Sequence, residues 1–167
     1  MALKFEPLEE IHNRIDFDCG EEALNLYLSH FARQDMRREL ARTFIIRKTG
    51  DYKILGYYTL CSGAINVNEL PHSILKKFPK RPVPVARLAR LAVDKKQQSK
   101  GYGELLLIDA LYRTSLAGES MGIYGMVIDA KHEKAQKFYQ HYGFQSLSLN
   151  PLLLFAPLKD LRNKFVS

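Results

Sequence analysis

The sequence predicts one α/β domain over residues 1–167, with a central mixed and mostly antiparallel sheet and helices on both of its faces. The chain is 46% apolar, which supplies one sizeable core, and its length is too short for two ordinary domains. Strand-like and helix-like segments alternate along the chain, and this order favours a sheet that is covered on both sides. Between residues 83 and 117, a strand, a glycine-containing loop and an apolar helix follow one another directly.

In the N-terminal part we expect a strand and two helices. Residues 3–8 have the pattern of a short strand. The first helix begins at Asp18 or Cys19, because apolar residues then recur at the spacing of one buried helical face: Leu24, Tyr27, Leu28 and Phe31. The second helix, at residues 33–42, is rich in arginine.

Two β-rich runs at residues 43–46 and 54–60 flank a turn-forming cluster at 48–51, which predicts an antiparallel hairpin. Residues 68–82 contain three prolines and are expected to form a loop with one helical turn. Six further elements follow in the order strand, helix, strand, helix, strand and strand, with Gly143 ending the second of these helices: residues 83–93, 104–117, 123–128, 131–142, 144–149 and 152–155.

The loop before the helix at 104–117 is the most informative part of the chain. Gly101 and Gly103 permit backbone conformations closed to other residues, so consecutive N–H groups can converge at the positive end of the helix dipole. Such a place holds a phosphate group well. The Walker pattern does not fit, and the dinucleotide fingerprint needs a third glycine where Leu106 stands. A solvated basic turn is the alternative interpretation.

The chain carries more positive than negative charge: 25 Lys and Arg against 18 Asp and Glu give a net charge of +7. This excess favours polyanionic partners or ligands, although each basic residue is also compatible with a solvated face. Arg87 and Arg90 are three residues apart on a predicted strand and should point to opposite faces. Basic residues gather in two places: Arg33, Arg37, Arg38 and Arg42, and then Lys76, Lys77, Lys80, Arg81, Arg87 and Arg90.

The two cysteines, Cys19 and Cys61, are far apart and lack the spacing of a metal or redox site. We expect thiols in a reducing cytoplasm rather than a disulfide. No histidine is assigned to a metal. No apolar run approaches the roughly 20 residues that span a bilayer, so a soluble, unexported protein with no membrane partner is expected.

The pattern Gln98-x-x-Gly101-x-Gly103 resembles the pyrophosphate-binding signature of the GNAT superfamily of N-acetyltransferases, and the order of elements is similar to theirs from end to end. The resemblance implies a GNAT fold and acetyl coenzyme A (acetyl-CoA) as the acetyl donor, without a metal. Lys95, Lys96 and Lys100 would add positive charge at the loop. The pyrophosphate would be held mainly through backbone N–H groups of the loop: Gln98, Ser99, Lys100, Gly101, Tyr102 and Gly103.

In the same superfamily, the strand before this loop diverges from its neighbour. The resemblance therefore implies that backbone groups of Leu91, Ala92 and Val93 bind the pantetheine arm and the acetyl carbonyl. Hydrogen bonds from N–H groups to that carbonyl would stabilise the negative charge that its oxygen gains during acyl transfer.

The pattern Ala135-x-x-Phe138-Tyr139-x-x-x-Gly143-Phe144 resembles the second hallmark of the superfamily, in which the tyrosine donates to the departing thiolate. A phenol with a pKa of about 10 remains protonated at neutral pH, whereas a thiol has a reference pKa of about 8.5. The alternative is that Tyr139 packs in the core, since aromatic residues at helical spacing usually do.

The position seven residues before Tyr139 holds His132, where many relatives carry an asparagine that contacts the cofactor. Any equivalent contact of His132 stays open. No strong general base stands out in the sequence. An α-amino group, with a reference pKa of about 7.7 to 8.0 against about 10.4 for lysine, is partly neutral at cytoplasmic pH, which favours α-amines as acceptors.

Five segments look like those of the TacT-type acetyltransferase toxins: residues 17–25, 42–44, 82–85, 90–94 and 150–158. This resemblance implies that the acceptor is the α-amino group of an aminoacyl-tRNA and that acetylation blocks translation. It further implies a ribbon-helix-helix antitoxin and a homodimer. Two alternatives are an N-acetyltransferase for small molecules or proteins, and a non-catalytic module that binds acyl-CoA or RNA.

Overall fold

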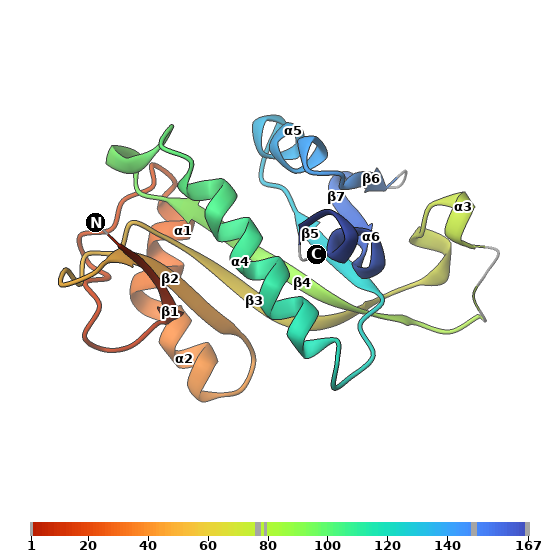
Figure 1. Ribbon diagram of the computed structural model, residues 1–167, viewed down its shortest axis with the longest axis horizontal. Helices are drawn as coiled ribbons and strands as arrows, with labels where there is room; N and C mark the ends of the chain where they lie inside the picture. The colour runs from red at the N-terminus through yellow and green to blue at the C-terminus, as the bar shows by residue number, and fades with distance from the viewer. Residues whose placement is uncertain (1, 76–77, 79, 148–149, 166–167) are drawn as a thin grey trace. The chain divides into compact units, whose positions relative to one another are not determined.

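The computed structural model describes residues 2–75, 78, 80–147 and 150–165 (Figure 1). Within these residues, seven strands form a sheet in the order β1-β2-β3-β4-β5-β7-β6. β4 runs parallel to β5, whereas the pairs β1-β2, β2-β3, β5-β7 and β6-β7 are antiparallel. The predicted mixed, mostly antiparallel sheet is therefore confirmed. The strands are β1 Leu3–Pro7, β2 Arg42–Lys48, β3 Gly56–Ile65, β4 Val83–Val93, β5 Gly125–Asp129, β6 Gln145–Leu147 and β7 Asn150–Pro157.

Helical segments connect these strands. The α-helices are α1 Glu22–Leu26, α2 Ala32–Arg37, α3 His72–Leu75, α4 Tyr102–Ala117, α5 Glu133–His141 and α6 Leu158–Phe165. The part of the chain that the structure describes also contains one π-helical turn and two 3-10 turns: η1 Tyr27–Phe31, η2 Val67–Glu69 and η3 Lys95–Gln97.

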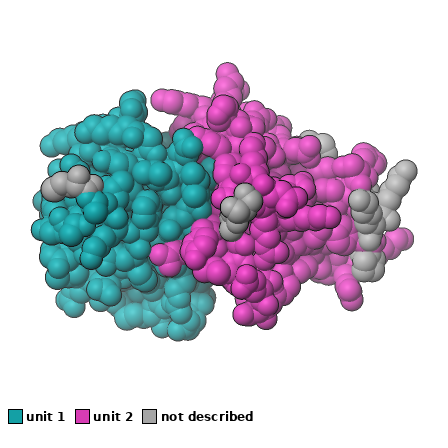
Figure 2. Space-filling model, in the orientation of Figure 1, with its two compact units in different colours: residues 1–61, 89–110 teal, residues 62–88, 111–167 magenta. Residues whose placement is uncertain are grey.

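The chain packs as two compact units (Figure 2). Unit 1 contains residues 1–61 and 89–110, and unit 2 contains residues 62–88 and 111–167. Strands β3 and β4 each contribute residues to both units. A single domain over residues 1–167 stays a prediction.

In unit 1, helices cover both faces of the sheet. Neighbouring residues of a strand point to opposite faces, and two tyrosines of β3 show what lies on each face. The Tyr57 hydroxyl donates to the Leu24 carbonyl of α1 at 2.7 Å. The Tyr58 hydroxyl donates to the Asp109 carboxylate of α4 at 2.5 Å. The prediction of helices on both faces is thus confirmed for this unit.

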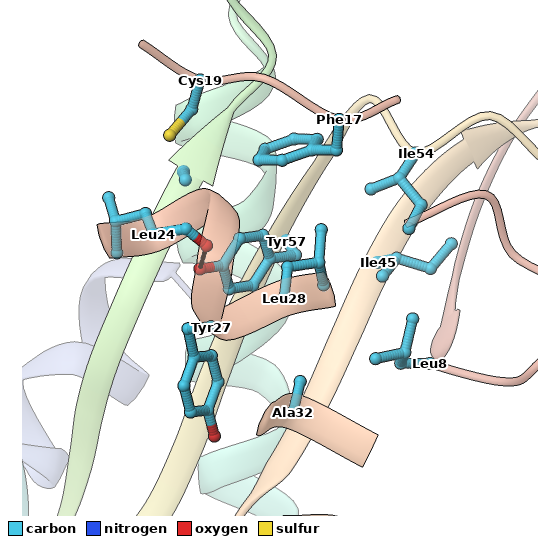
Figure 3. Packing of buried hydrophobic residues seen from close by; sticks show 11 residues of the cluster. Leu8, Phe17, Cys19, Leu24, Tyr27, Leu28, Ala32, Ile45, Ile54 and Tyr57 are labelled. Carbon is cyan, nitrogen blue, oxygen red and sulfur yellow. Dashed lines mark hydrogen bonds between the residues drawn. The ribbon is translucent and has the colours of Figure 1, made fainter. Parts of the chain in front are cut away.

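A hydrophobic cluster fills the space between the sheet and the helical run of α1, η1 and α2 (Figure 3). Tyr57 and Leu28 are fully buried in it, and Phe17 packs edge-on against Tyr57 with 5.5 Å between ring centroids. Complete burial of such side chains contributes roughly 1.5–3 kcal/mol each, so this cluster anchors the helical run to the sheet. The cluster comprises Leu8, Phe17, Cys19, Leu24, Tyr27, Leu28, Ala32, Ile45, Ile54, Tyr57 and Ala92.

The first helix differs from the prediction at its start and in its middle. It begins at Glu22 rather than at Asp18 or Cys19, because Asp18 uses its backbone N–H and C=O to bond the segment after β4. Its middle contains the π-helical turn η1. Phe31, predicted to be buried, is 46% exposed, and Ala32 takes the buried place.

The second helix is shorter than predicted. α2 ends at Arg37, with Arg38 as its C-cap, and Glu39 adopts a positive φ of 61° that a helix cannot continue. Arg42 is therefore the first residue of β2 and not the last residue of a helix. The predicted helix at residues 33–42 is thus wrong in its second half, and Arg38 and Arg42 do not share a helix.

In unit 2, the antiparallel strands β5, β7 and β6 and the first part of β4 carry a second core cluster that includes Val85, Val127, Leu147 and Phe155. β7 begins at Asn150, so the break predicted at Asn150 and Pro151 is wrong. Proline is tolerated there because the β5 ladder reaches only to Leu153, and Pro151 lies beyond it.

α6 is absent from the prediction, and several boundaries shift by one to five residues, as segment ends commonly do. α6 buries Leu158 and Leu161. Its Arg162 donates from Nε and Nη2 to the hydroxyl and the carbonyl of Ser115, each at 2.9 Å. The shifted elements include β3, which extends to Ile65, and β5, which begins at Gly125.

Cys19 and Cys61 both remain as thiols, as expected. Burial raises the pKa of the Cys19 thiol. Among the described helices, none combines the length and the apolar character that a bilayer crossing requires.

Candidate functional site

The C-terminal end of β4 extends past its pairing with β5. The parallel ladder between the two strands reaches Leu88, which pairs with Ile128. β4 itself continues to Val93. The predicted thioester-binding residues Leu91, Ala92 and Val93 therefore lie beyond that ladder, which is the placement that the resemblance implied. Their contact with acetyl-CoA stays a prediction.

The loop after β4 turns twice through left-handed backbone conformations. Asp94 first caps η3, because its carboxylate accepts from the Lys96 N–H at 2.9 Å. Ser99 then adopts a φ of 66° and Gly101 a φ of 86°. Gly101 and Gly103 were expected to provide such conformations, but Gly103 already lies within α4. Ser99 and Gly101 provide them instead.

The first turn of α4 leaves backbone donors available. Leu105 donates to the Gly101 carbonyl at 3.2 Å, which is the first helical hydrogen bond. Within the described chain, the N–H groups of Tyr102, Gly103 and Glu104 meet no backbone or side-chain acceptor, as expected for the start of a helix. A Cβ atom added to Gly101 would have nothing within 4 Å. Unpaired donors at an open surface fit a pyrophosphate group.

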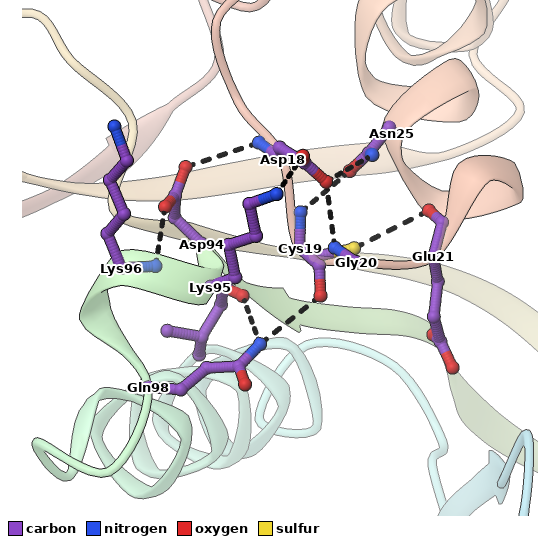
Figure 4. A network of polar contacts seen from close by, with 10 residues as sticks. Asp18, Cys19, Gly20, Glu21, Asn25, Asp94, Lys95, Lys96 and Gln98 are labelled. Atoms are coloured by element: carbon purple, nitrogen blue, oxygen red, sulfur yellow. Dashed lines mark hydrogen bonds and ion pairs between the residues drawn. The ribbon is translucent and has the colours of Figure 1, made fainter.

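Gln98 fastens this loop to the rest of unit 1 (Figure 4). Its Nε2 donates to the carbonyl of Val93 at 3.1 Å and to the carbonyl of Cys19 at 3.2 Å. The side chain thus spans the end of β4 and the segment before α1. We conclude that the Gln98 side chain shapes the loop, while its backbone is the part left to contact a ligand.

The charge at the loop is lower than the sequence predicts. Lys95 Nζ lies 2.9 Å from Asp18 Oδ2, and the Lys95 backbone N–H donates to the Asp18 carbonyl at 2.8 Å (Figure 4). The hydrogen bonds from Lys95, Asn25 and Gly20 lower the pKa of Asp18 to about 2, and Asp18 raises the pKa of Lys95. The positive charge of Lys95 is thus balanced by the carboxylate of Asp18.

Lys96 and Lys100 keep their charge for a ligand. Lys100 Nζ donates to the Gln97 side-chain oxygen at 3.1 Å, and this partner is neutral. Within the described residues, Lys96 forms no ion pair with a carboxylate. These two lysines supply the positive charge that the sequence assigned to three.

A cavity of about 750 Å³ lies beside this segment in unit 1 and is lined by Asp18, Asp94, Lys95 and Lys96 among others. Two of the carboxylates that line this cavity already have partners within the protein, since Asp18 pairs with Lys95 and Asp94 caps η3. Across the described parts of the chain, no group of three or more His, Cys, Asp or Glu is arranged to hold a metal ion.

Tyr139 belongs to a helix end with a defined geometry. Phe144 donates its backbone N–H to the Tyr139 carbonyl at 3.2 Å, and Gly143 donates to the Gln140 carbonyl at 3.1 Å. Together with the φ of 97° at Gly143, these bonds form a Schellman motif. The rings of Tyr139 and Phe144 lie 6.2 Å apart. The predicted Gly143 cap is confirmed. The sequence pattern from Ala135 to Phe144 corresponds to a single helix end, whose hydrogen bonds fix the position of Tyr139.

The Tyr139 hydroxyl stands apart from those of the other buried tyrosines. Tyr27, Tyr57 and Tyr58 each donate to a protein oxygen at 2.5 to 2.8 Å. For Tyr139, no acceptor is found among the described residues, although its side chain is only 6% exposed. Burial raises the pKa of Tyr139 well above its ordinary value of 10.0. The Tyr139 oxygen is not among the buried side-chain atoms that lack a partner in the described chain, so it reaches the surface and a ligand can contact it.

His132 is the N-cap of α5. Its Nδ1 accepts from the Ala135 N–H at 3.2 Å. Asparagine is a preferred N-cap residue, and histidine performs that capping task here. This accounts for His132 structurally and assigns it no role as a base.

The predicted RNA-binding residues of unit 1 have different surroundings. Arg37 and Arg38 are exposed and Arg33 is half-buried, whereas Arg42 pairs with Glu39 and donates to the Met36 carbonyl at 2.9 Å. The Arg90 guanidinium lies over the Tyr27 ring, 3.5 Å from its centroid. Arg42 and Arg90 are thus engaged within the protein, while the other three are available.

In unit 2, Lys80 and Arg81 are exposed, and Arg87 forms an ion pair with Asp129. Lys76 and Lys77 lie outside the described residues.

No pattern in the sequence indicates that Phe31 is exposed or that Arg90 packs on Tyr27. Apolar periodicity cannot reveal a π-helical turn, and the stacking partner of Arg90 is distant in sequence.

Comparisons with known proteins agree with this geometry. The family described as Acetyltransferase (GNAT) domain matches residues 41–146. A tRNA-acetylating toxin of Mycobacterium tuberculosis is 36% identical over 146 residues, which are 87% of this chain and 86% of the relative.

Several solved structures are similar over almost the whole chain. A tyrosine-to-phenylalanine mutant of KacT has a TM-score of 0.92 at 33% identity, covering 98% of this chain and 99% of the other. AtaT in complex with acetyl-methionyl-tRNAfMet has a TM-score of 0.89 at 36% identity, covering 97% and 98%. A mutant AtaT bound to acetyl-CoA and to the C-terminus of the antitoxin AtaR has a TM-score of 0.84 at 32% identity, covering 99% of each chain.

Proposed function

Because this chain belongs to the GNAT acetyltransferase family, we propose that it transfers the acetyl group of acetyl-CoA to the α-amino group of an aminoacyl-tRNA. The likeness to AtaT in complex with acetyl-methionyl-tRNAfMet carries this proposal. The reaction breaks the thioester C–S bond and forms an amide C–N bond. An amide nitrogen is a poor nucleophile, so the acetylated tRNA cannot take part in the next peptide bond, and the protein acts as a toxin of translation.

Acetyl-CoA supplies the activated acetyl group. The loop donors at the start of α4 and the charges of Lys96 and Lys100 support pyrophosphate binding by residues 98–103. Backbone groups of Leu91, Ala92 and Val93 would orient the pantetheine arm and polarise the acetyl carbonyl. This assignment is supported by the extension of β4 beyond its ladder with β5.

Tyr139 would assist the departure of the thiolate. Its hydroxyl is protonated across the neutral range, because burial raises its pKa, and it meets no acceptor within the described residues. A thiol has a reference pKa of about 8.5, below that of Tyr139. Full proton transfer is therefore uphill, and Tyr139 would stabilise the thiolate mainly by donating a hydrogen bond.

The acceptor amine needs no strong base in this proposal. A fraction of an α-amino group is already neutral at pH 7, given a reference pKa of about 7.7 to 8.0. The proton released on amide formation passes to solvent. Attraction of the tRNA would come from the net charge of +7 and from contacts of phosphates with exposed basic residues: Arg33, Arg37, Arg38, Lys80 and Arg81.

The partner and the setting are inferred from the same relatives. A mutant AtaT binds the C-terminus of the antitoxin AtaR, and we infer that an antitoxin, of the ribbon-helix-helix class, neutralises this chain too. A cytoplasmic location belongs to the proposal, since charged tRNA is the proposed substrate. A homodimer belongs to it as well.

The test is acetylation of charged tRNA by the purified protein with isotopically labelled acetyl-CoA. Mass spectrometry of the released aminoacyl group should show the added acetyl mass, and inhibition of a translation extract should require acetyl-CoA. Faster acetylation of polyamines or peptides than of charged tRNA would favour the small-molecule or protein acetyltransferase instead.

Tyr139→Phe tests the role of the hydroxyl. We expect turnover to fall by roughly 10²-fold or more, the usual contribution of a positioned acid, with acetyl-CoA affinity largely kept. Tyr142→Phe is the matched control, because it removes a hydroxyl from the end of the same helix α5. Equal activity of both variants would contradict the assignment of Tyr139, and inhibition by Tyr139→Phe at full strength would point to a non-catalytic binding module.

A further inference from the structure

The π-helical turn η1 exposes an aromatic side chain. The Ala32 N–H donates to the Tyr27 carbonyl five residues earlier, so this turn contains one residue more than an α-helical turn. The extra residue rotates the next part of the helix, so that Ala32 is fully buried and Phe31 is 46% exposed. In a regular helix Phe31 would share the buried face of Leu24 and Leu28.

Contacts from other segments support the widened turn. The Tyr27 hydroxyl donates to Asp35 Oδ2 at 2.8 Å, and the Arg90 guanidinium covers the Tyr27 ring at 3.5 Å. The Ser29 carbonyl accepts from Arg14 Nη1 at 3.3 Å. Single π-helical turns are rare and often occur at functional sites, so an exposed Phe31 held in this way calls for a functional explanation.

Phe31 is followed in sequence by three arginines that form no ion pair among the described residues. Arg33 and Arg37 lie four residues apart on one face of α2, and Arg38 caps this helix. Among the described residues, Arg33, Arg37 and Arg38 form no ion pair with a carboxylate. Arg38 follows Phe31 by seven residues and so lies on the same side of the helix, whereas Arg33 and Arg37 project from other sides. An apolar ring with an unpaired arginine on its side complements a ligand that combines flat rings with phosphates, and single-stranded nucleic acid has this chemistry.

The position of the turn indicates which part of a tRNA would reach it. Tyr27, the first residue of η1, contacts Arg90, and Arg90 directly precedes Leu91 in β4. Residues 91–93 are those assigned to the acetyl carbonyl. The amine that accepts the acetyl group is attached to the last nucleotide of the tRNA, so the unpaired nucleotides next to it are the closest RNA.

We propose that Phe31 is a stacking platform for an unpaired base at the 3′ end of the aminoacyl-tRNA, with Arg38 contacting an adjacent phosphate. This inference rests on the proposed function, because it assumes that charged tRNA is the acceptor. Every base offers a flat π face, so the platform binds the 3′ end without selecting its sequence.

Kinetics of Phe31→Ala test the platform. Stacking on an aromatic side chain strengthens binding of a base by roughly 5- to 100-fold, so the KM for charged tRNA should rise by that factor. The KM for acetyl-CoA should be unchanged, and Phe31→Trp should restore the wild-type KM for tRNA. Tyr112→Ala, which removes another half-exposed aromatic ring, is the control and should have no effect. An unchanged KM for tRNA in Phe31→Ala would overturn the proposal.

A binding measurement separates this inference from the proposed function. An RNA hairpin with an unpaired 3′ overhang should bind the wild-type protein more tightly than a blunt hairpin, and Phe31→Ala should abolish that difference. If the wild-type protein acetylates no charged tRNA, the proposed function fails, while the hairpins still decide the role of Phe31. If Phe31→Ala weakens binding of both hairpins equally, or weakens binding of the antitoxin alone, Phe31 does not stack on an unpaired base.

Discussion

Replacing Gly101 with alanine measures what the loop at residues 98–103 requires of its backbone. The φ of 86° at Gly101 lies in the left-handed region, where a side chain costs roughly 1–2 kcal/mol. A Cβ there would have no heavy atom within 4 Å, so steric contact with neighbours adds nothing. The full cost of Gly101→Ala is therefore a backbone cost.

That cost must appear either in folding or in binding. If the ligand-free protein keeps the loop as it is, the free energy of unfolding falls by about 0.8 kcal/mol, within a range of about 0–1.6 kcal/mol, after an offset of about 0.4–1 kcal/mol from the stiffer unfolded chain. If the ligand-free loop relaxes, stability is kept and the Kd for acetyl-CoA rises by roughly 5- to 30-fold, because 1.4 kcal/mol corresponds to a factor of ten.

Urea unfolding and calorimetric titration with acetyl-CoA measure the two quantities. Gly101→Asn should recover much of the loss, since asparagine tolerates the left-handed region. Gly122→Ala is the matched control, because Gly122 has neither a positive φ nor a close neighbour. If Gly101→Ala changes unfolding by less than about 0.3 kcal/mol and the Kd by less than about twofold, the loop does not depend on this conformation.

Two further predictions concern stability. Tyr57→Phe removes the buried hydrogen bond to the Leu24 carbonyl at 2.7 Å and should lower the free energy of unfolding in urea by about 1 kcal/mol, whereas Tyr112→Phe, at a half-exposed site, should leave it unchanged; equal effects would contradict the role of this bond. Burial by itself raises the pKa of Glu6, but the hydrogen bond and charge of Arg47 outweigh it and hold the pKa below the ordinary value of 4.5. A lowered folded pKa gives stability that is complete above the unfolded pKa and is lost as the pH falls through the folded pKa. The wild-type urea midpoint should thus fall more steeply than that of Glu6→Gln between about pH 5 and pH 3, and parallel curves would speak against the pairing.

The sequence was sufficient for the features that depend on local chemistry. The strand at 83–93 was predicted with its observed bounds, because prolines precede it and the glycine-containing loop comes directly after it. Gly143 was predicted as a helix end for the same kind of reason, since only a residue that accepts a positive φ continues the chain there. Strand pairing in the hairpin of β2 and β3 was predicted from turn residues between two β-rich runs.

The sequence was insufficient where a distant segment decides the state of a side chain. Lys95 carries a charge in the sequence, but Asp18 pairs with it only because the chain brings the two together. Arg42 was placed in a helix because helical propensity does not show the turn at Glu39. Neither the ion pair nor the turn can be recognised from the local pattern of residues.

By itself, then, the sequence determined the order of strands and helices up to β7, the turn at Gly101 between β4 and α4, and the tyrosine-bearing helix end, since each depends on glycine conformations and apolar spacing within a few residues. Only the tertiary structure decided that the Tyr139 hydroxyl lacks an acceptor within the described chain and that Phe31 faces solvent. Whether a hydroxyl has a partner depends on atoms that folding brings together. Which side of a helix is buried depends on a single extra residue in one turn, and the contacts of Tyr27 and Arg90 support that turn.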